Sequence, residues 1–428
     1  MSPSDRRVDV LVVGAGPAGL AAAHSLRGSA LSTLLVDGGK PVHQRDRDRS
    51  SDMTRGHGGA GLFSDGKFSF YPSASRLWTL PHRSELRAAY EWTCQVLRAA
   101  GLDTPPFPDE PDSFAIDAGE WVLKEYPSYY LSLPARLALS ATLVAESEAE
   151  LLTETEVVDL VHAPQDDVFR AVLRDGTGAR TRVEARRVVV ATGRFGPLAL
   201  NGLLTPRLWR RLEVGFRIEQ PAGEAFFRSM KQLDPKLRFR SDDGRVEWRT
   251  FCACRQGEAV ATETEGLWTV SGRADCPATG RSNIGFNTRI LDEAVAERAL
   301  SALLRAAAAE SSGFDEPLLE VLEPGSPERS RLERVYGVEL TAFMCEGVQH
   351  LAERFPEVRT ERTRLIGPTM EGVGWYPAVR PDLRLPDTPA WVAGDSCGMF
   401  RGIVAAMISG HYAAARLKAS LPAPAVAR

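Results

Sequence analysis

The hydrophobic pattern is clearest near the N-terminus, where an apolar run leads through three glycines into a second apolar run. Residues 8–13 (VDVLVV) are mostly apolar, which is typical of a strand buried in a parallel sheet. Gly14, Gly16 and Gly19 follow with the spacing G-x-G-x-x-G, and residues 20–26 continue as an alanine-rich apolar segment. The pattern predicts a strand, a tight turn and a helix.

The glycine spacing, in this context, predicts a dinucleotide site. One glycine makes the turn, one lets the backbone approach a pyrophosphate, and one lets the helix pack on the strand. The helix N-terminus then offers free N–H groups to the phosphates. A second strand at residues 32–36 ends in Asp37, where an acid is expected to hold ribose hydroxyls. An acid favours FAD or NAD over NADP, and the alternative is an ordinary strand–turn–helix that binds nothing.

Alternating apolar and polar residues dominate the middle of the chain. Residues 151–189 predict three antiparallel strands, the last of which runs into Ala191-Thr192-Gly193. Strand-like segments continue through residues 203–276. A short apolar strand at 391–393 precedes Gly394-Asp395. Amphipathic or apolar periodicity predicts helices at residues 84–100, 133–146, 291–309, 329–354 and 403–417.

Two segments after Asp37 differ in character. Residues 38–53 are rich in Arg and Asp, and we expect a solvated loop there. Residues 55–70 (RGHGGAGLFSDGKFSF) carry four glycines in six positions, followed at once by apolar residues. This combination predicts a backbone that lies close to a flat or charged group, with a flexible surface loop as the alternative.

Composition restricts the functional classes. The chain has 428 residues, a net charge of −4 and no basic surplus that would favour nucleic acid. No apolar run is long enough to span a membrane, and no secretory signal is evident. Six scattered cysteines without a C-x-x-C pair argue against a zinc knuckle and fit a reducing cytoplasm.

Short motifs resemble a known family. GAGPAG at 14–19, ATG at 191–193 and AGD at 393–395 are similar to FAD-dependent oxidoreductases with a glutathione-reductase-type nucleotide domain. GGAGLFSDGK (58–67), GFRIE (215–219) and RTFCACRQGEAV (249–260) resemble the poorly characterised FAD-dependent dehydrogenases of that superfamily. This chain departs from them in its bulky residues 399–401, beside the flavin in the superfamily.

The resemblance implies an α/β fold: a Rossmann-like FAD-binding domain, with a parallel sheet and an antiparallel meander, and an inserted sheet-based α+β substrate domain. We assign residues 1–75, 134–202 and 341–428 to the FAD-binding domain, 76–133 to a helical or loop insertion, and 203–340 to the substrate or cap domain.

The resemblance also implies non-covalent FAD. Only one G-x-G-x-x-G is present, so NAD(P)H would serve as a transient donor, and a protein electron partner remains open. The expected FAD contacts are Gly14, Gly16, Pro17, Ala18, Gly19, Asp37, Gly59, Ala60, Gly61, Thr192, Gly193, Gly394, Asp395, Gly402 and Ile403.

Candidate catalytic residues follow from position. His57 adjoins the glycine run and can move protons near neutral pH; a loop histidine bonded to backbone is the alternative. Cys397 follows the GD motif as a redox thiol or an inert packed cysteine. Arg401, with Arg217 and Arg249, is a candidate for clamping a substrate carboxylate, surface salt bridges being the default.

Two cysteines are further candidate catalytic residues. Cys252 and Cys254, at C-x-C spacing, would lie on one face of a strand, either as a dithiol or as two buried small residues.

These features predict a dehydrogenase or reductase that moves hydride between a small organic substrate and flavin N5. A flavin monooxygenase is the first alternative, although the Asp-Gly motif usual in those hydroxylases is replaced by Ala191-Thr192-Gly193. A non-catalytic flavin redox or scaffold protein is the second.

Overall fold

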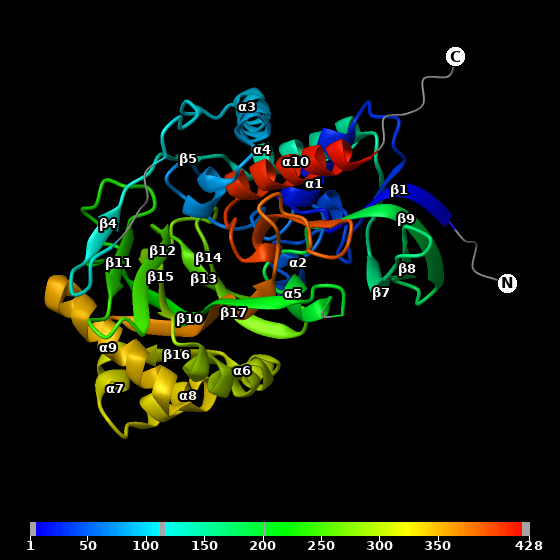
Figure 1. Ribbon diagram of the computed structural model, residues 1–428. Helices are drawn as coiled ribbons and strands as arrows, with labels where there is room; N and C mark the ends of the chain where they lie inside the picture. The colour runs from blue at the N-terminus through cyan, green and yellow to red at the C-terminus, as the bar shows by residue number, and fades with distance from the viewer. Residues whose placement is uncertain (1–5, 112–115, 201, 422–428) are drawn as a thin grey trace, which may run out of the picture.

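The computed structural model describes residues 6–111, 116–200 and 202–421, which form two large sheets with helical layers (Figure 1). The first sheet has the order β6-β2-β1-β9-β8-β7, and β18 pairs with β9. β1, β2, β6, β9 and β18 run parallel, whereas β7, β8 and β9 form an antiparallel meander, so the predicted combination is confirmed. The strands are β1 (Arg6–Val13), β2 (Thr33–Val36), β6 (Glu150–Leu152), β7 (Thr155–Ala163), β8 (Val168–Asp175), β9 (Arg180–Val190) and β18 (Ala390–Val392).

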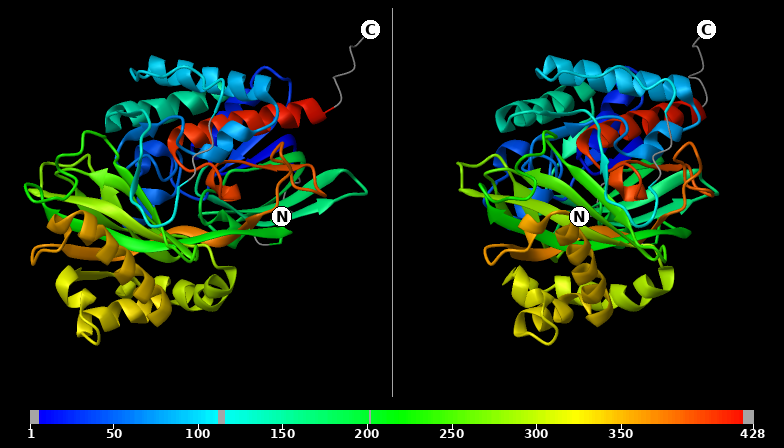
Figure 2. Two further views of the ribbon diagram at one scale, coloured as in Figure 1. Left: turned by 60° about the vertical axis from the view of Figure 1, so that its left-hand side comes forward. Right: turned by 90° about the vertical axis from the view of Figure 1, so that its left-hand side faces the viewer.

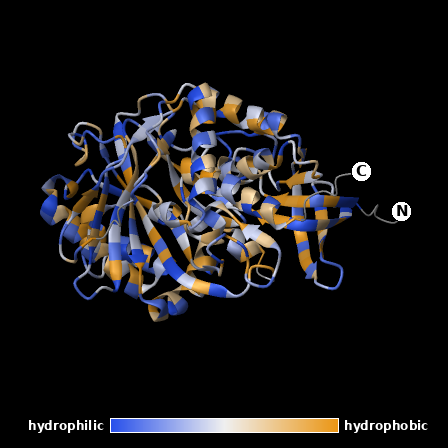
Figure 3. Cartoon of the chain, turned by 45° about the horizontal axis from the view of Figure 1, so that its top comes forward, coloured by the Kyte–Doolittle hydropathy of each residue, from blue (hydrophilic) through white to orange (hydrophobic). Residues whose placement is uncertain are grey.

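Burial explains the two kinds of pattern in this sheet. Val10, Leu11 and Val12 of β1 are fully buried between β2 and β9, so their strand is apolar on both faces. β7 and β8 project from the body of the molecule, and polar and apolar residues alternate along them (Figure 3). The alternation that predicted these strands is therefore the pattern of a ribbon with one covered face.

Helices α1 (Pro17–Leu26) and α10 (Ile403–Ser420) pack together over the first sheet. Gly410 permits this approach, because a Cβ there would lie 1.9 Å from the carbonyl oxygen of Ala18. α3 (Arg83–Ala99) and α4 (Leu133–Ser147) complete the layer, and both match the predicted helices. The short helices of this half are α2 (Ser50–Thr54) and α5 (Gly196–Ala199).

The second sheet is antiparallel, in the order β16-β17-β10-β15-β12-β11-β4. Its core is separate from that of the first sheet and centres on aromatic residues such as Phe216, Phe286 and Trp248. Its strands are β4 (Val122–Lys124), β10 (Arg207–Pro221), β11 (Lys236–Arg240), β12 (Val246–Cys254), β15 (Arg281–Ile290), β16 (Phe314–Pro317) and β17 (Arg364–Pro377). Two small two-stranded sheets lie beside the large ones: the hairpin of β13 (Glu258–Thr264) and β14 (Leu267–Arg273), and the pair β3 (Lys67–Ser69) and β5 (Ser128–Tyr130), which are distant in the chain.

Helices cover one face of the second sheet, and its other face is turned toward the half of the molecule that contains the first sheet (Figure 2). α6 (Glu293–Ala307) matches its predicted helix. The helix predicted at 329–354 is two helices, because Gly337 adopts a φ of +79° at the break. The covering helices also include α7 (Leu318–Leu322), α8 (Pro327–Tyr336) and α9 (Val338–Arg354).

Two strands of the second sheet come from outside residues 203–340. β4 lies within the expected insertion, and β17 lies within residues 341–428, which we assigned to the FAD-binding domain. β17 pairs along its length with β10, a contact that no local pattern announces. The second sheet thus gathers strands from three separate parts of the chain.

Across the part of the chain described here, no helix combines the length and apolar character that a membrane crossing requires.

Candidate functional site

The turn between β1 and α1 is shaped by its glycines. Gly14 has a φ of +101°, and a Cβ there would lie 2.5 Å from the carbonyl oxygen of Ala191. A Cβ on Gly19 would lie 1.8 Å from the carbonyl oxygen of Gly14, so this glycine lets the helix pack on the turn. Gly16 precedes α1 with a φ of −76° and faces the backbone of Gly59. The unpaired N–H groups at the start of α1 therefore lie beside glycine backbone that carries no side chains.

Asp37 fixes the end of β2 against this turn. One carboxylate oxygen accepts a hydrogen bond from the backbone N–H of Ala15 at 2.7 Å, and the other accepts from Gly39 at 2.8 Å. An ionised carboxylate has lone pairs beyond these two bonds. The position lets Asp37 accept further hydrogen bonds from a sugar.

The glycine-rich segment lies directly on the turn. Gly58 donates its N–H to the carbonyl oxygen of Ala15 at 2.9 Å, and Gly56, Gly58 and Gly59 all have positive φ. A Cβ on Gly59 would lie 2.9 Å from Pro17, and a Cβ on Gly61 would lie 2.7 Å from Ile403. The close approach that the four glycines predicted is an approach to α1 and α10.

Two buried arginines, which the sequence did not single out, hold this segment in place. Arg45 donates to the carbonyl oxygens of His57 and Gly59, at 2.8 and 3.0 Å. Arg136 of α4 donates to the carbonyl oxygen of Gly61 and pairs with Asp275. The expectation of a solvated loop at residues 38–53 is therefore wrong for Arg45, which is 7% exposed.

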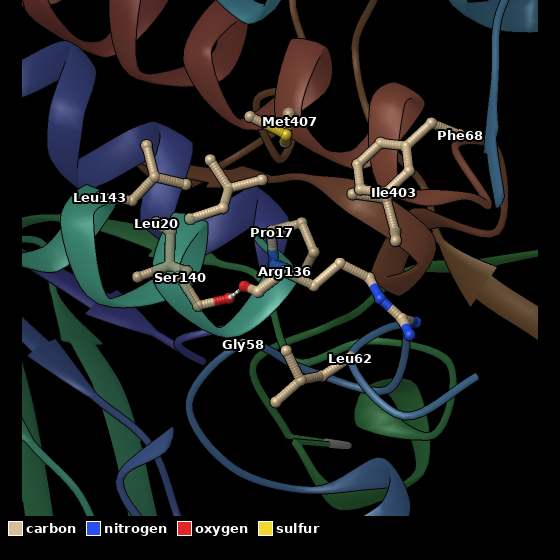
Figure 4. Close-up of a pocket in the computed structure, with 11 residues that line it drawn as sticks. Pro17, Leu20, Gly58, Leu62, Phe68, Arg136, Ser140, Leu143, Ile403 and Met407 are labelled. Carbon is tan, nitrogen blue, oxygen red and sulfur yellow. Dashed lines mark hydrogen bonds between the residues drawn. The ribbon is translucent and has the colours of Figure 1, made fainter. Parts of the chain in front are cut away.

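Figure 4 shows the apolar packing behind the glycine segment. Leu62 of the segment packs with Leu20 of α1 and Met407 of α10 around a small cavity, and Ser140 of α4 donates its hydroxyl to the carbonyl oxygen of Arg136. This packing fixes the segment against the first turns of α1 and α10, since Pro17 and Ile403 also line the small cavity.

The GD motif lies at the end of β18, next to the N-terminus of α10. Asp395 accepts a hydrogen bond from Arg401 through Oδ2 at 2.9 Å, whereas its Oδ1 is buried and has no partner among the described residues. Burial would raise the pKa of this carboxyl group, but Arg401, Arg194 and Arg211 lower it further than that, so Asp395 is ionised. An ionised oxygen without a donor needs one.

These segments line one cavity of about 1190 Å³. We call the part formed by residues 14, 16–18, 59–61, 394–395 and 402 the glycine wall. Among the described residues, Gly19 is the one expected FAD contact that does not reach the cavity. The other expected contacts that line it are Gly14, Gly16, Pro17, Ala18, Asp37, Gly59, Ala60, Gly61, Thr192, Gly193, Gly394, Asp395, Gly402 and Ile403.

His57 and Cys397 do not belong to the cavity lining in the described part of the chain. The His57 ring is buried, with Nε2 at 3.0 Å from the carbonyl oxygen of Ser140 and Nδ1 accepting from the N–H of Val42 at 3.4 Å. Burial lowers the pKa of His57. The alternative of a loop histidine bonded to backbone describes it, and its candidacy as a proton carrier is corrected.

Cys397 is likewise corrected to a packed thiol. It is fully buried, and its Sγ donates to the carbonyl oxygen of Gly394 at 3.2 Å. Burial raises the pKa of this thiol to about 12. Because the thiolate is the reactive form of cysteine, Cys397 is inert near neutral pH.

Arg401 does line the cavity, but as part of a charged network rather than a surface salt bridge. It pairs with Asp395 at 2.9 Å, Glu371 at 2.8 Å and Glu213 at 3.3 Å. Arg249 also lines the cavity and pairs with Glu213 at 2.8 Å. Arg217 is 1% exposed and donates to the backbone carbonyl oxygen of Cys252 at 2.6 Å.

A second charged group lies on the cavity wall near the FSDGK motif. Lys67 pairs with Asp65 at 3.1 Å and lies 3.9 Å from Asp234. Tyr126 donates its hydroxyl to Asp234 at 3.0 Å. Burial lowers the pKa of Lys67, but the two carboxylates outweigh it and the net shift is upward. The motif was visible in the sequence, whereas Asp234 and Tyr126 carry no local signal.

The two cysteines of the C-x-C pair lie beside this group. Cys252 lines the cavity with a φ of +50°, and Cys254 is fully buried with its Sγ near Arg217. Their thiols share a hydrogen bond that raises the pKa of Cys252 and lowers that of Cys254. A bulge in the pairing of β12 with β15 brings them together, so simple strand alternation does not describe them.

Comparisons with solved structures give distant resemblances over most of the chain. Solved structures that resemble this one include a flavoprotein/dehydrogenase from Cytophaga hutchinsonii (16% identity, TM-score 0.43, 96% of this chain and 78% of that one). Another is a geranylgeranyl bacteriochlorophyll reductase-like protein from Thermoplasma acidophilum (14% identity, TM-score 0.44, 97% of this chain and 79% of that one). The myxobacterial halogenase CndH also resembles it (12% identity, TM-score 0.40, 96% of this chain and 73% of that one). None of these distant resemblances transfers an activity.

None of the curated proteins matches the sequence. Residues 8–214 match the model of the pyridine nucleotide-disulphide oxidoreductase family. The matched segment holds the turn between β1 and α1, the glycine-rich segment and the meander. The match supports an FAD-binding oxidoreductase as the coarse description of this protein.

Proposed function

We propose that the protein transfers hydride between a small organic substrate and the N5 atom of non-covalently bound FAD, as a dehydrogenase or reductase. The observation that carries the proposal is the convergence of the glycine wall on the buried Oδ1 of Asp395, which has no donor among the described residues. A ribityl hydroxyl of a flavin would supply that donor. The orphaned oxygen therefore supports a polyol-bearing cofactor at this place.

The residues of the glycine wall fit the other parts of FAD. The open backbone at Gly14 and Gly16, with the N-terminus of α1, suits the pyrophosphate. Asp37 would accept from the adenosine ribose. Gly59 and Gly61, which tolerate no side chain in this packing, would lie beside the ring system. When bound, FAD supplies the two-electron chemistry.

The chain's own residues would bind and orient the substrate. Tyr126 and Lys67 present a hydroxyl and an ammonium group on the cavity wall, and both are hydrogen-bonded or paired with Asp234. Burial chiefly raises the pKa of Tyr126, so its hydroxyl keeps its proton. We assign these two side chains to holding a substrate oxygen while the cavity excludes bulk water.

The domain assignment is part of this proposal, with β4 and β17 counted with the second sheet. Residues around the first sheet would bind FAD, and the second sheet would bind the substrate. NAD(P)H that binds transiently, or a protein partner, would exchange electrons with the flavin in the other half-reaction and return it to its starting oxidation state.

The first test uses the purified protein, which should be yellow from its bound flavin. Heat denaturation should release FAD into the supernatant, identified by chromatography and mass spectrometry. FMN, or flavin that stays with the precipitate, would contradict the proposal. Anaerobic stopped-flow mixing with NADH and NADPH then follows the loss of flavin absorbance, and repetition in oxygen detects a hydroxylating enzyme. Failure of every donor to reduce the flavin would favour a redox or scaffold role.

A further inference from the structure

One face of the second sheet carries an unusual arrangement of like charges. Lys236 of β11 lies directly opposite Lys124 of β4, and Arg238 of β11 lies directly opposite Arg249 of β12. All four side chains line the cavity, and we call them the basic wall. Like charges directly opposite one another destabilise a sheet. Two such pairs on neighbouring strands therefore need a compensating group.

Among the described residues, two buried carboxylates pair with the arginines of this sheet. Glu247 pairs with Arg238 at 2.7 Å and with Arg289 at 3.4 Å. Glu213, which is 0% exposed, already pairs with Arg211, Arg249, Arg289 and Arg401. Several arginines thus share two buried carboxylates.

Two nitrogen atoms in this cluster show the shortfall. Among the described residues, the Nζ of Lys236 has no hydrogen bond or ion pair, and it lies 5.1 Å from the ring centre of Tyr126. The Nε of Arg249 is buried without a hydrogen-bond partner in the same part of the chain. Burial, with the neighbouring Arg249 and Arg401, lowers the pKa of Lys236 to about 8 despite Asp234. Within the described residues, the Nζ of Lys236 and the Nε of Arg249 therefore lack an acceptor.

The cavity has room for a second molecule. Its volume of about 1190 Å³ exceeds the range of about 300–1,000 Å³ that is usual for one ligand. The glycine wall occupies the side formed by the first sheet and α1, whereas the basic wall belongs to the second sheet. A cofactor on the first side leaves the second side for the substrate.

We propose that the basic wall binds a carboxylate or phosphate group of the substrate, through Lys236 and Arg249 in particular. This inference rests on the proposed function, because it places the reacting end of the substrate toward a flavin on the glycine wall. Lysine and arginine form charge-assisted hydrogen bonds with both kinds of anion. Bound there, the anion would separate the two like-charged pairs and provide acceptors for the Nζ of Lys236 and the Nε of Arg249.

The test uses the FAD-containing protein and isothermal titration calorimetry at low salt. The probes are succinate and inorganic phosphate, with neutral succinamide as the control ligand. Lys236→Gln removes the ammonium group, which has no hydrogen-bond or ion-pair partner among the described residues, and Lys236→Met retains the apolar stem in case the first variant fails to fold. Lys231→Gln is the matched control, since Lys231 is exposed and outside the cavity lining.

We expect at least one anion to bind the wild type and Lys231→Gln at least tenfold more tightly than either Lys236 variant. Tighter binding of succinate assigns a carboxylate substrate, and tighter binding of phosphate assigns a phosphorylated one. Equal affinities for wild type and Lys236 variants, or anion binding no tighter than that of succinamide, would overturn the inference. Flavin content is recorded separately: a protein without flavin refutes the proposed function, whereas a flavin-loaded protein with unchanged affinities refutes this inference alone.

Discussion

The two walls of the cavity are built by different means. The glycine wall is formed by backbone atoms, where the missing side chains of Gly14, Gly59 and Gly61 allow segments to touch. The basic wall is formed by long charged side chains on neighbouring strands of the second sheet. A backbone site has its geometry fixed by local sequence, and a side-chain site depends on which strands meet. The first kind suits a constant cofactor, and the second suits a substrate that differs between related proteins.

The largest expected effect separates two glycines of the same motif. Gly16→Val should abolish FAD binding while the protein remains folded, because Gly16 lines the cavity, has an ordinary φ of −76°, and an added Cβ would lie at an ordinary contact distance of 3.6 Å from the Cα of Gly59. Gly19→Val should prevent folding, since its Cβ would lie 1.8 Å from a backbone oxygen. The measurements are soluble yield, circular dichroism and flavin content.

A soluble Gly19→Val protein would show that the close packing at this turn is dispensable. Normal flavin content in Gly16→Val would mean that the turn has only a structural role. The glycine wall would then not be a cofactor site.

The same contrast explains what the sequence could and could not predict. The meander of β7, β8 and β9 and the turn at Gly14 follow from contiguous patterns, and both are present. Arg45 carried the signal of a solvated polar segment, yet it is buried against backbone carbonyls. Its burial depends on the positive φ values of a glycine segment further along the chain.

The basic wall was hidden for a related reason. Lys124 and Lys236 become neighbours only through the register of β4 on β11, which no local periodicity specifies. His57 illustrates the opposite error: proximity in sequence to the glycine run suggested chemistry, but its ring faces Ser140 of α4. Adjacency along a chain does not decide on which side of a loop a side chain lies.

The second prediction concerns the charge balance of the second sheet. Glu213→Gln should lower the free energy of unfolding by about 3–5 kcal/mol, because removal of one partner leaves buried charges unpaired. The affected partners include Arg249 and Arg289. Denaturant unfolding of the FAD-loaded protein measures the loss, with Glu357→Gln as a control at a half-exposed side chain.

The pH dependence sharpens this prediction. Burial would raise the pKa of Glu213, but the arginines outweigh it and lower the pKa well below its usual 4.5. A carboxyl group whose pKa falls on folding stabilises the protein above its unfolded pKa, and this contribution is lost as the pH drops. As the pH is lowered from about 4.5, the free energy of unfolding of Glu213→Gln should therefore fall less than that of the wild type. Parallel acid profiles would show that folding does not lower the pKa of Glu213.

The third prediction concerns Asp395 of the glycine wall, which Arg401 connects to Glu213. Asp395→Ala should weaken FAD binding by about 10- to 150-fold, corresponding to about 1.5–3 kcal/mol for a hydrogen bond to a charged group. Asp395→Asn keeps an acceptor oxygen and should lose less. Arg401 retains Glu371 and Glu213 as partners in both variants. Flavin retention during dialysis measures the effect, and equal retention by all three proteins would remove the Oδ1 of Asp395 from the cofactor site.

The smallest expected effect concerns the N-terminus of α10. Ile403 begins this helix, lines the cavity and touches Gly61, so its first turn points its free N–H groups and partial positive charge toward the place we assign to the flavin. That charge would stabilise negative charge on the reduced cofactor. Ile403→Asp should oppose it and lower the midpoint potential. Helix ends contribute about 0.3–2 kcal/mol, which corresponds to at most about 40 mV for a two-electron couple.

Ile403→Asn is the matched control, because it loses the same apolar packing without adding charge. Redox titration of the three proteins at full FAD occupancy decides the matter: a potential that falls equally in both variants reports lost packing, whereas a larger fall in Ile403→Asp than in Ile403→Asn assigns the effect to the helix.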